Sequence, residues 1–517
     1  MLQSIRLRNL RSFADSDNSP YIDLKPITVL IGKNSSGKST FLRSLPLLRQ
    51  SVEAHTTGPI LWYSSYVDFG AFSEAKKFDI KDNIIYFDFK IQLSPNTPNY
   101  FSSYYYHLKR KILSSKDVNV VVEVGVTEIN NKTILKKLSL QLYNHKYIFI
   151  FNNDKKCDLY IDGTLSKISE DLGYLNLNQF LPLIGFWTKD NQRFDDEGAS
   201  DYFYNILHLE IKKYFGKTSD STIKDGLARI GLNERDDIKD VLTKIFKSNR
   251  TFIKNLEKKE EDICDMVYNL SLSASISSLL VTINNELVNT FKNIKYIAPL
   301  RSTAERYYRH QDLQVKEIDH TGSNLAMLLR SLPKKENELF TQWTNENFGF
   351  QVKVEEQGLH YALKIKAGSD PREYNINDMG FGFSQILPIV VSIWMETSRN
   401  KKTTLRQKKS DIIFAIEQPE LHLHPEYQSR LARMFVSVIN TAKERGLSLK
   451  IIFETHSQTM VNTLGDCIED ELLNSQDVNI VVFEKELDSS TTKVKFSHFN
   501  NEGFLEEWPI GFFSGRR

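Results

Sequence analysis

Three continuous apolar runs predict the buried strands of a parallel sheet. Residues 27–31 are Ile-Thr-Val-Leu-Ile, and residues 412–416 and 451–453 consist of isoleucine, phenylalanine and alanine. A strand that is covered on both faces loses the usual alternation of apolar and polar positions. Because these runs lie near the two ends of the chain, among helical patterns, they predict an α/β core.

The middle of the chain has a different pattern. Residues 78–165 contain short β-branched and aromatic runs between polar turns, as in an antiparallel meander. Residues 200–292 combine apolar runs with Lys/Glu segments, so we expect helices with solvated charged faces there. At residues 5–8, isoleucine and leucine alternate with two arginines, which predicts a short half-buried strand.

Composition places the chain among globular proteins and limits its partners. The 517 residues include 67 Lys and Arg against 65 Asp and Glu, and 40% are hydrophobic. These values exclude a disordered chain and a strongly basic nucleic-acid arm. The three cysteines form no C-x-x-C pair, so we expect reduced thiols. We see neither a signal peptide nor a run of 18 apolar residues, which predicts a cytoplasmic protein without a membrane span.

The segment from Gly32 to Thr40 matches the phosphate-loop pattern G-x-x-x-x-G-K-[ST]. It follows a predicted strand and precedes a predicted helix, which is the context that this motif requires. Glycines let backbone N–H groups turn toward phosphates, the lysine reaches the β- and γ-phosphates, and the serine hydroxyl binds Mg²⁺. Pro46 should bend or end the following helix. The predicted ATP-binding residues are Gly32, Asn34, Ser35, Ser36, Gly37, Lys38, Ser39 and Thr40.

Three further segments carry candidate chemistry. An apolar strand ends in Glu417, which would put a carboxylate beside Mg²⁺ at the carboxyl edge of a parallel sheet. The next apolar strand is followed by Glu454-Thr455-His456-Ser457, where the histidine could sense a γ-phosphate or an attacking water. Residues 377–385 contain two glycines and Ser-Gln before an apolar helix, either a second phosphate-binding helix N-terminus or a simple turn.

In this order, the four motifs resemble those of ABC-type ATPase heads, which include recombination-mediator, chromosome-structuring and overcoming-lysogenisation-defect ATPases. The resemblance covers about 1–75 and 293–517, including residues 5–13 and 420–425. It implies an α/β P-loop NTPase fold of the ABC-ATPase-head type, with an antiparallel β lobe and a helical insertion. The expected regions are the N-terminal part of the head with the Walker A motif and the β lobe (1–195), the helical insertion (196–292), and the C-terminal part of the head with the signature, Walker B and switch histidine (293–517).

Four other stretches more closely resemble the ATPase subunits of Septu-type and retron-associated antiphage systems. The stretch 508–513 resembles the terminus of a family of uncharacterised ATPase-associated domains. This resemblance implies an ATPase of an antiphage defence system that scaffolds and regulates a separate effector nuclease. The four stretches are residues 58–63, 66–72, 296–301 and 508–513.

The resemblance also implies a role for each motif. Glu417 would be the Walker B acid, holding Mg²⁺ with Ser39, and His456 would be the switch histidine. Such heads associate head to tail, so it implies a homodimer or larger homo-oligomer with ATP between the copies. Gln50 and residues 68–70 are both candidates for the Q-loop. The signature residues, which would touch the γ-phosphate bound to a second copy, are Gly380, Gly382, Ser384 and Gln385.

Gln418 departs from the pattern of many such heads, which carry a second acid there as the general base. A neutral amide can orient water but cannot accept its proton. Either Glu420 takes this role or hydrolysis is slow, and we favour slow turnover with the nucleotide acting as a conformational signal. The predicted catalytic residues are Glu417, Gln418, Glu420 and His456.

Two other groups have simpler explanations than a binding site. His422 and His424 are spaced as on a strand without a third ligand nearby, so packing or capping is favoured over metal binding. Residues 104–106 are tyrosines followed by the basic residues 109–111, and together they could stack on and grip a nucleic acid. An exposed hairpin with a basic edge is the favoured explanation of that pattern.

Two interpretations from different functional classes remain. The first is a regulatory ATPase that controls an effector nuclease of HNH type, with a retron reverse transcriptase and its DNA, or another nucleic acid, as further partners. The chain itself is expected to cut nothing, because it lacks an HNH-like Cys/His pattern and the Asp-x-Asp of a Toprim domain after His456. The second is a DNA-repair or recombination ATPase acting directly on nucleic acid. Near-neutral charge and the lack of a long coiled coil favour the first.

Overall fold

The computed structural model forms two compact units, each built from segments that are distant in the sequence. Unit 1 comprises Met1–Asn9, Ser51–Leu61 and Asp79–Asn289, and unit 2 comprises Leu10–Gln50, Trp62–Phe78 and Thr290–Arg517. The three regions expected from the sequence (1–195, 196–292 and 293–517) were drawn from its residue patterns, and this division stays a prediction. The residues described are 1–15, 19–54, 56, 58–78, 80, 82–95, 97, 116–176, 179–187, 193–302, 305–309, 315, 317–358, 360–368, 370–397, 411–485 and 491–506.

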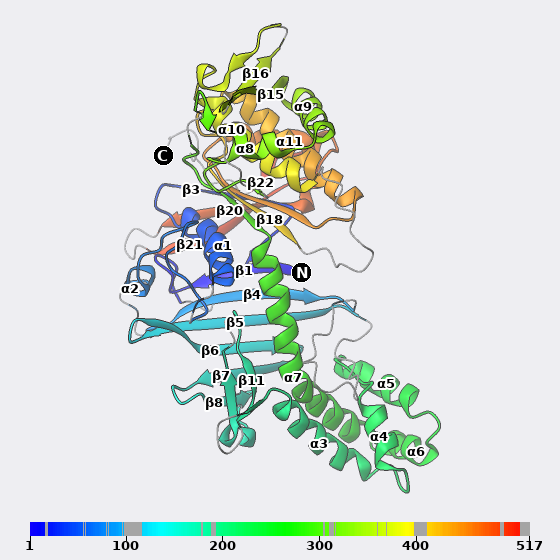
Figure 1. Ribbon diagram of the computed structural model, residues 1–517. Helices are drawn as coiled ribbons and strands as arrows, with labels where there is room; N and C mark the ends of the chain where they lie inside the picture. The colour runs from blue at the N-terminus through cyan, green and yellow to red at the C-terminus, as the bar shows by residue number, and fades with distance from the viewer. Residues whose placement is uncertain are drawn as a thin grey trace. The chain divides into compact units, whose positions relative to one another are not determined.

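Unit 1 contains an antiparallel sheet whose strands follow one another in the order β1-β4-β5-β6-β7-β8-β9. Figure 1 shows β4 to β8 side by side. The predicted antiparallel meander is therefore confirmed. A smaller sheet has the order β10-β11-β12. The strands are β1 (Leu2–Arg8), β4 (Ile85–Leu93), β5 (Val118–Ile129), β6 (Lys132–Leu142), β7 (His145–Phe151), β8 (Cys157–Ile161), β9 (Thr164–Leu165), β10 (Leu172–Leu175), β11 (Leu183–Trp187) and β12 (Phe194–Asp195).

The predicted helix-rich stretch is also confirmed. Its helices are α3 (Gly198–Lys212), α4 (Asp220–Leu227), α5 (Ile238–Ile245), α6 (Arg250–Lys258) and α7 (Glu260–Lys292). Within the described residues, only α7 is long and apolar enough to cross a membrane by length and composition, with a mean hydropathy of 1.5 over 18 residues. Because 67% of that window is buried inside the structure, α7 has the character of a core helix.

Strand β1 corrects the expectation of a half-buried strand. Arg6 and Arg8, expected to face solvent, are 9% and 7% exposed. Asp88 on β4 is fully buried and accepts hydrogen bonds from Arg6 Nε at 2.8 Å and Arg8 Nε at 2.7 Å. The strand is buried on both faces because a carboxylate about 80 residues away neutralises its arginines, a pairing that alternation alone does not reveal.

Asp88→Asn is expected to destabilise the protein by about 3–5 kcal/mol, because it removes the buried charge that the guanidinium groups of Arg6 and Arg8 share. The half-buried Glu123, which also meets Arg6, provides the matched control, and Glu123→Gln should cost clearly less. Urea denaturation measures both free energies of unfolding. An Asp88→Asn protein as stable as the wild type would contradict this view of the network.

Unit 2 contains a sheet with the strand order β13-β18-β19-β3-β20-β21-β22. Neighbours from β13 to β20 are parallel, and β20-β21 and β21-β22 are antiparallel. The three apolar runs are β3, β18 and β19, so their assignment as parallel strands is confirmed. The strands are β13 (Ile294–Ile297), β18 (Ile412–Glu417), β19 (Leu449–Glu454), β3 (Ile27–Gly32), β20 (Val478–Lys485), β21 (Thr492–Phe499) and β22 (Leu505–Glu506).

Helices and a second small sheet complete unit 2. The second sheet has the order β14-β16-β15, with β17 also paired to β16. Its strands are β14 (Tyr308–Arg309), β15 (Phe350–Gln357), β16 (His360–Ala367) and β17 (Tyr374–Asn375), and the short β2 spans Ile22–Asp23. The helices are α1 (Lys38–Glu53), α2 (Phe72–Ala75), α8 (Leu325–Ser331), α9 (Lys334–Phe348), α10 (Phe381–Thr397), α11 (Pro425–Glu444) and α12 (Gln458–Glu469).

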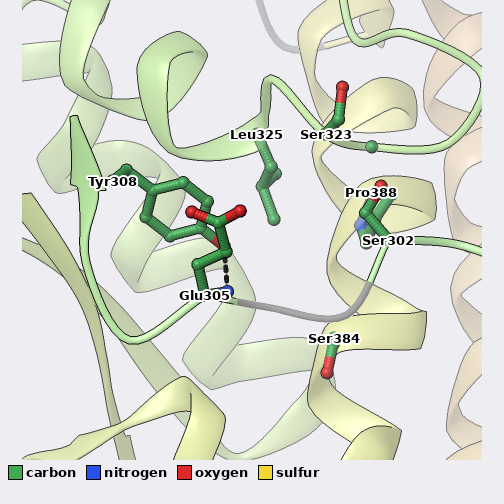
Figure 2. A pocket seen from close by; sticks show the side chains of 8 residues that line it. Ser302, Glu305, Tyr308, Ser323, Leu325, Ser384 and Pro388 are labelled. Atoms are coloured by element: carbon green, nitrogen blue, oxygen red, sulfur yellow. Dashed lines mark hydrogen bonds between the residues drawn. The ribbon is translucent and has the colours of Figure 1, made fainter. Parts of the chain in front are cut away.

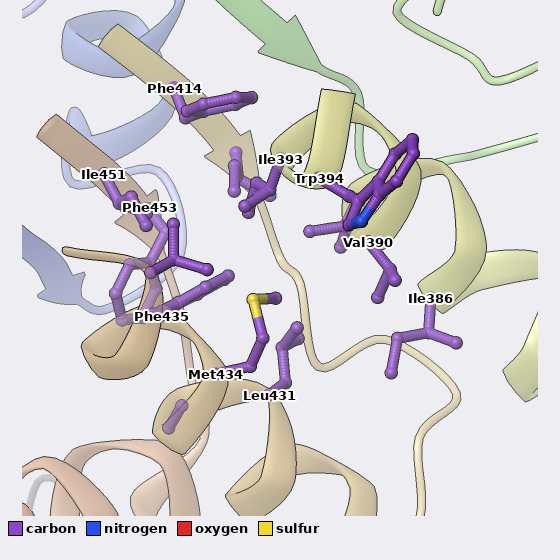
Figure 3. Close-up of a cluster of buried hydrophobic side chains, with 14 of the residues drawn as sticks. Ile386, Val390, Ile393, Trp394, Phe414, Leu431, Met434, Phe435, Ile451 and Phe453 are labelled. Atoms are coloured by element: carbon purple, nitrogen blue, oxygen red, sulfur yellow. The ribbon is translucent and has the colours of Figure 1, made fainter. Parts of the chain in front are cut away.

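A hydrophobic core holds β18 and β19 against α10 and α11. Figure 3 shows Trp394 of α10 and Phe435 of α11 in this cluster with Phe414 of β18 and Phe453 of β19. The rings of Phe435 and Phe453 lie 5.4 Å apart. This packing fixes the carboxyl ends of both strands, where Glu417 and Glu454 stand opposite each other in register.

Helix α1 does not end at Pro46 but continues through it to Glu53, so of the two expected effects of the proline only the bend stays a prediction. Leu45, Leu47 and Leu48 around it are fully buried. Tertiary packing of this apolar face therefore outweighs the loss of one helical hydrogen bond.

Candidate nucleotide-binding site

The phosphate-loop segment joins β3 to α1 through a tight backbone turn. Gly37 has φ +107°, and a Cβ there would lie 2.5 Å from Thr492 Oγ1. At Gly32, with φ +152°, a Cβ would lie 2.3 Å from the Phe483 carbonyl oxygen. Both positions therefore require glycine, and together they bring the loop back to the N-terminus of α1.

Lys38 lies inside this loop rather than in solvent. The residue is 3% exposed, and its Nζ donates to the carbonyls of Gly32 at 2.9 Å and Lys33 at 2.8 Å. Burial lowers the pKa of its ammonium group, and the nearby Glu454 carboxylate opposes that shift. The Lys38 ammonium group thus lies inside the turn of the phosphate loop, at the position that the motif requires for phosphate contact.

The other loop residues divide between the tip and the base of the loop. Asn34 and Ser35 are exposed, and Ser35 adopts φ 59°. Ser36 and Thr40 are buried, at 1% and 8% exposure. Thr492 on β21 donates to the Ser36 carbonyl at 2.9 Å, so a strand near the end of the chain fixes the loop.

Ser39 contacts an acid to which the sequence had given no role. Its Oγ donates to Glu454 Oε2 at 2.7 Å, and Glu454 Oε1 lies 3.7 Å from Lys38 Nζ. Glu454 is 4% exposed, and burial raises the pKa of its carboxyl while the Ser39 hydrogen bond and Lys38 oppose the rise. Glu454 stands at the end of an apolar strand, as Glu417 does, and this position is the signal in the sequence that could have pointed to it.

Glu417 is fully engaged by neighbouring side chains. Its carboxylate accepts from Arg43 Nε at 2.7 Å, Arg43 Nη2 at 2.9 Å and the Tyr296 hydroxyl at 2.6 Å. Burial and then the Glu417 charge raise the pKa of Tyr296, and the Glu417 hydrogen bond raises the pKa of Arg43. Sequence reasoning missed Arg43, although it lies one helical turn after Ser39 and thus on the same face of α1.

Gln418 and Glu420 occupy the turn after β18. Gln418 has φ 42°, and its backbone N–H donates to the Glu454 carbonyl at 2.9 Å. Glu420 Oε1 accepts from the backbone N–H of His456 at 2.7 Å. Its Oε2 is buried without a hydrogen-bond partner among the described residues. Burial raises the pKa of this carboxyl.

Arg301 connects the end of β18 to helix α10. Its Nη2 donates to the carbonyls of Glu417 at 2.9 Å and Gln418 at 3.0 Å. Gln385 on α10 donates to the Arg301 carbonyl at 3.3 Å. Burial lowers the pKa of the guanidinium group to about 10. Arg301 belongs to a stretch that sequence resemblance singled out, but its contacts could not be derived from it.

The predicted signature residues lie at the N-terminus of α10 and within it. The helix begins at Phe381, so Ser384 and Gln385 lie inside it, at 5% and 4% exposure, instead of before it as expected. Gly380 is exposed and lies just before the helix. Its φ of +80° is a conformation that glycine takes readily.

Ser384 lines a cavity of about 80 Å³. Figure 2 shows Ser384 below Pro388 on the same helix, with Tyr308 and Glu305 to the left of both. The Tyr308 hydroxyl accepts from the Glu305 backbone N–H at 3.1 Å.

The predicted histidines have different environments. His456 is exposed, and partial burial of its ring and then Lys38 lower its pKa. His424 caps α11, its Nδ1 accepting from the Glu426 N–H at 3.3 Å, in agreement with the capping explanation. The ring of His422 lies 5.8 Å from that of Phe381. No group of three or more His, Cys, Asp and Glu arranged to hold a metal occurs among the described residues.

The two Q-loop candidates are both held by local contacts. Gln50 is buried, its side chain donating to the Val67 carbonyl at 3.3 Å and accepting from the Val67 N–H at 3.2 Å. Asp68 accepts from the Gly70 N–H at 2.7 Å. The tyrosine and basic cluster at 104–111 and the stretch 508–513 lie outside the described residues. The three cysteines are free and buried.

A family model described as AAA ATPase domain matches residues 1–461 of the chain. The chain belongs to this AAA ATPase domain family. The match extends through the middle of the chain, where the sequence motifs gave no resemblance. Family membership implies that the protein binds nucleotide and is an ATPase, and the α/β P-loop fold is confirmed.

Several solved structures align with this AAA ATPase at low sequence identity. The SMC head domain from Thermotoga maritima has 8% identity and TM-score 0.33, covering 96% of this chain and 98% of that one. The Smc head bound to the C-terminal domain of ScpA, from Pyrococcus furiosus, has 10% identity, TM-score 0.33 and 96% coverage of both. The recombination mediator protein RecF with ATP has 10% identity and TM-score 0.28, covering 96% and 99%. No curated protein matches the chain.

The side chains of this AAA ATPase fit a nucleotide phosphate group with its divalent cation. A buried ammonium, Lys38, lies at the N-terminus of a 16-residue helix, where the helix dipole favours anions. The Ser39 hydroxyl and the Glu454 carboxylate lie together beside it and supply the hard oxygen ligands that Mg²⁺ takes. Such a cation would neutralise charge on the phosphate oxygens.

Proposed function

We propose that this AAA ATPase is an ATP-controlled switch that hydrolyses slowly and regulates a partner protein. One observation carries the proposal: Lys38, Ser39 and Glu454 lie together at the phosphate loop. The neutral Gln418 stands where the resemblance to ABC-type heads implies a general base. A site that binds ATP well but lacks an efficient base keeps the nucleotide for a long time. Nucleotide occupancy then acts chiefly on conformation and association.

The proposal gives each of the site residues a role. Lys38 and the backbone of the phosphate loop bind the β- and γ-phosphates in this proposal. The resemblance names Ser39 and Glu417 as the ligands of Mg²⁺, but Glu417 is paired with Arg43, and Ser39 contacts Glu454 instead. Glu420, with one unpartnered carboxylate oxygen, orients or deprotonates the attacking water. His456 is exposed near Lys38, in a position to respond to a γ-phosphate.

Arg301 supports a switch because it joins two parts of the site. It holds the backbone at Glu417 and Gln418, and it contacts Gln385 on α10. The N-terminus of α10, with Gly380 exposed, is the surface that would meet the nucleotide of a second copy. A change at the end of β18 therefore has a direct route to the surface used for head-to-tail association.

The resemblance to Septu-type and retron-associated subunits supplies the biological setting of the proposal. In that setting, the ATPase is a cytoplasmic scaffold of an antiphage defence system. ATP-dependent dimers or larger oligomers hold a separate effector nuclease, of HNH type, inactive until a trigger arrives. A retron reverse transcriptase and its DNA, or another nucleic acid, are the proposed further partners.

The test is to purify the chain together with the proteins encoded beside it, with and without ATP, and to measure the native mass. We expect a heteromer that contains a nuclease and that changes its mass or composition with ATP. The Lys38→Ala chain, treated identically, should not respond to ATP. A chain that carries no partner and binds DNA upon ATP addition, with affinity falling steeply as salt rises, would instead support the repair interpretation.

A further inference from the structure

The strand order of unit 2 places two acids at different distances from the phosphate loop. Strand β19 lies between β18 and β3, so Glu454 is on the strand adjacent to the loop and Glu417 is one strand farther away. Glu454 pairs in register with Leu30 on one side and with Glu417 on the other. Accordingly, Ser39 donates its hydrogen bond to Glu454.

The partners of Glu417 make it a poor ligand for a further cation. The residue is 3% exposed and accepts three hydrogen bonds, two of them from the guanidinium of Arg43. Drawing this carboxylate toward a metal would break its two hydrogen bonds with Arg43, whose side chain is 36% exposed, and its hydrogen bond with Tyr296. Glu454, in contrast, meets one neutral hydroxyl and, at 3.7 Å, the ammonium of Lys38.

We propose that Glu454, together with Ser39, holds the divalent cation of the bound nucleotide, and that Glu417 is a positioning residue that anchors Arg43 and Tyr296. This inference rests on the proposed function, because it concerns the same nucleotide site. A carboxylate and a hydroxyl in contact are hard oxygen ligands, the type that Mg²⁺ requires. The assignment moves the principal metal-facing acid from β18 to β19.

The charges around Glu454 support this assignment. Its carboxylate is buried, and Lys38 lies closer to two loop carbonyls than to it. When phosphate oxygens attract Lys38, Glu454 loses its nearest positive charge. A divalent cation on Ser39 would replace that charge at the same place. The competing explanation is that Glu454 only neutralises Lys38 in the nucleotide-free loop.

The experiment measures how strongly Mg²⁺ tightens ADP binding. The Kd of a fluorescent ADP is determined in EDTA and in excess MgCl₂ for the full chain and for the variants Glu454→Gln, Glu417→Gln and Ser39→Ala. The ratio of the two Kd values reports the coupling between metal and nucleotide. We expect Glu454→Gln to lower this ratio about tenfold or more while ADP still binds in EDTA, and Glu417→Gln to keep most of it.

A second measurement covers the case in which Glu454→Gln is unstable. Mn²⁺ binding in the presence of ADP, followed by its electron paramagnetic resonance signal, should weaken in Ser39→Ala and in Glu454→Asp, which keeps the charge beside Lys38, and should stay close to the wild-type value in Glu417→Gln. A loss in Glu417→Gln as large as the loss in Ser39→Ala would overturn the proposal. The proposal would also be overturned if Glu417→Gln lost the ratio of Kd values between EDTA and MgCl₂ while Glu454→Gln kept it. Tighter ADP binding by Glu454→Gln with an unchanged ratio of Kd values would overturn it as well. If wild type binds ADP in neither buffer, the proposed function fails instead.

Discussion

Lys38→Ala is expected to weaken ATP binding by about 10²-fold or more and to abolish measurable hydrolysis. The buried ammonium already donates two hydrogen bonds inside the phosphate loop, at 2.9 and 2.8 Å. Phosphate oxygens would take over these donors as charge-assisted hydrogen bonds, each contributing about 1.5–3 kcal/mol. Two such bonds correspond to the predicted loss of affinity. Equilibrium binding of a fluorescent ATP analogue gives the affinity, and phosphate release gives the hydrolysis rate.

Lys33 offers a matched control on the same loop. It is exposed, and its backbone carbonyl rather than its side chain contacts Lys38. Lys33→Ala removes one positive charge from the loop surface, where screening is strong, so we expect a change of about twofold. Equal losses in the two variants would show that general loop charge, and not the buried ammonium, binds the nucleotide.

Glu420→Gln is expected to lower kcat for ATP hydrolysis by about 10²-fold, the lower end of the range for losing a general base. Of the acids near the loop, Glu417 and Glu454 are engaged by hydrogen bonds, whereas one oxygen of Glu420 has no partner among the described residues. Because burial raises the pKa of Glu420, kcat should rise with pH through a value above that of an ordinary glutamate. Steady-state phosphate release across pH measures both effects.

Substitutions at Gln418 complete this test. Gln418→Ala should change kcat only a few-fold, because an amide accepts no proton. Gln418→Glu should raise kcat by about tenfold or more, since it restores a carboxylate at the usual position of the base. A fast wild-type enzyme whose kcat survives Glu420→Ala would refute both the slow turnover and the role of Glu420.

The sequence predicted the parts of this protein whose physics is local. The phosphate loop requires glycines at fixed positions, and Gly37 has the positive φ and the close neighbour that explain why. The apolar runs that form β3, β18 and β19 have no alternation because both faces are buried. His424 was expected to pack or cap, and it caps α11.

What the sequence did not predict depends on contacts between distant segments. Arg6 and Arg8 are buried because Asp88 on another strand neutralises them. The contact of Ser39 with Glu454 follows from the position of β19 between β18 and β3, and motif order along the chain does not encode that strand order. Likewise, the helical start at Phe381 buries Ser384, which motif spacing had placed in a loop.

The most direct test of the central claim, that ATP controls association of this AAA ATPase, is the native mass of the purified chain with and without ATP. We predict one copy without nucleotide and two or more with ATP, and no change for Lys38→Ala. Persistence of the larger species over many minutes would fit slow hydrolysis. A chain that demonstrably binds ATP yet keeps the same mass would contradict the account, because the nucleotide would then have no effect on assembly.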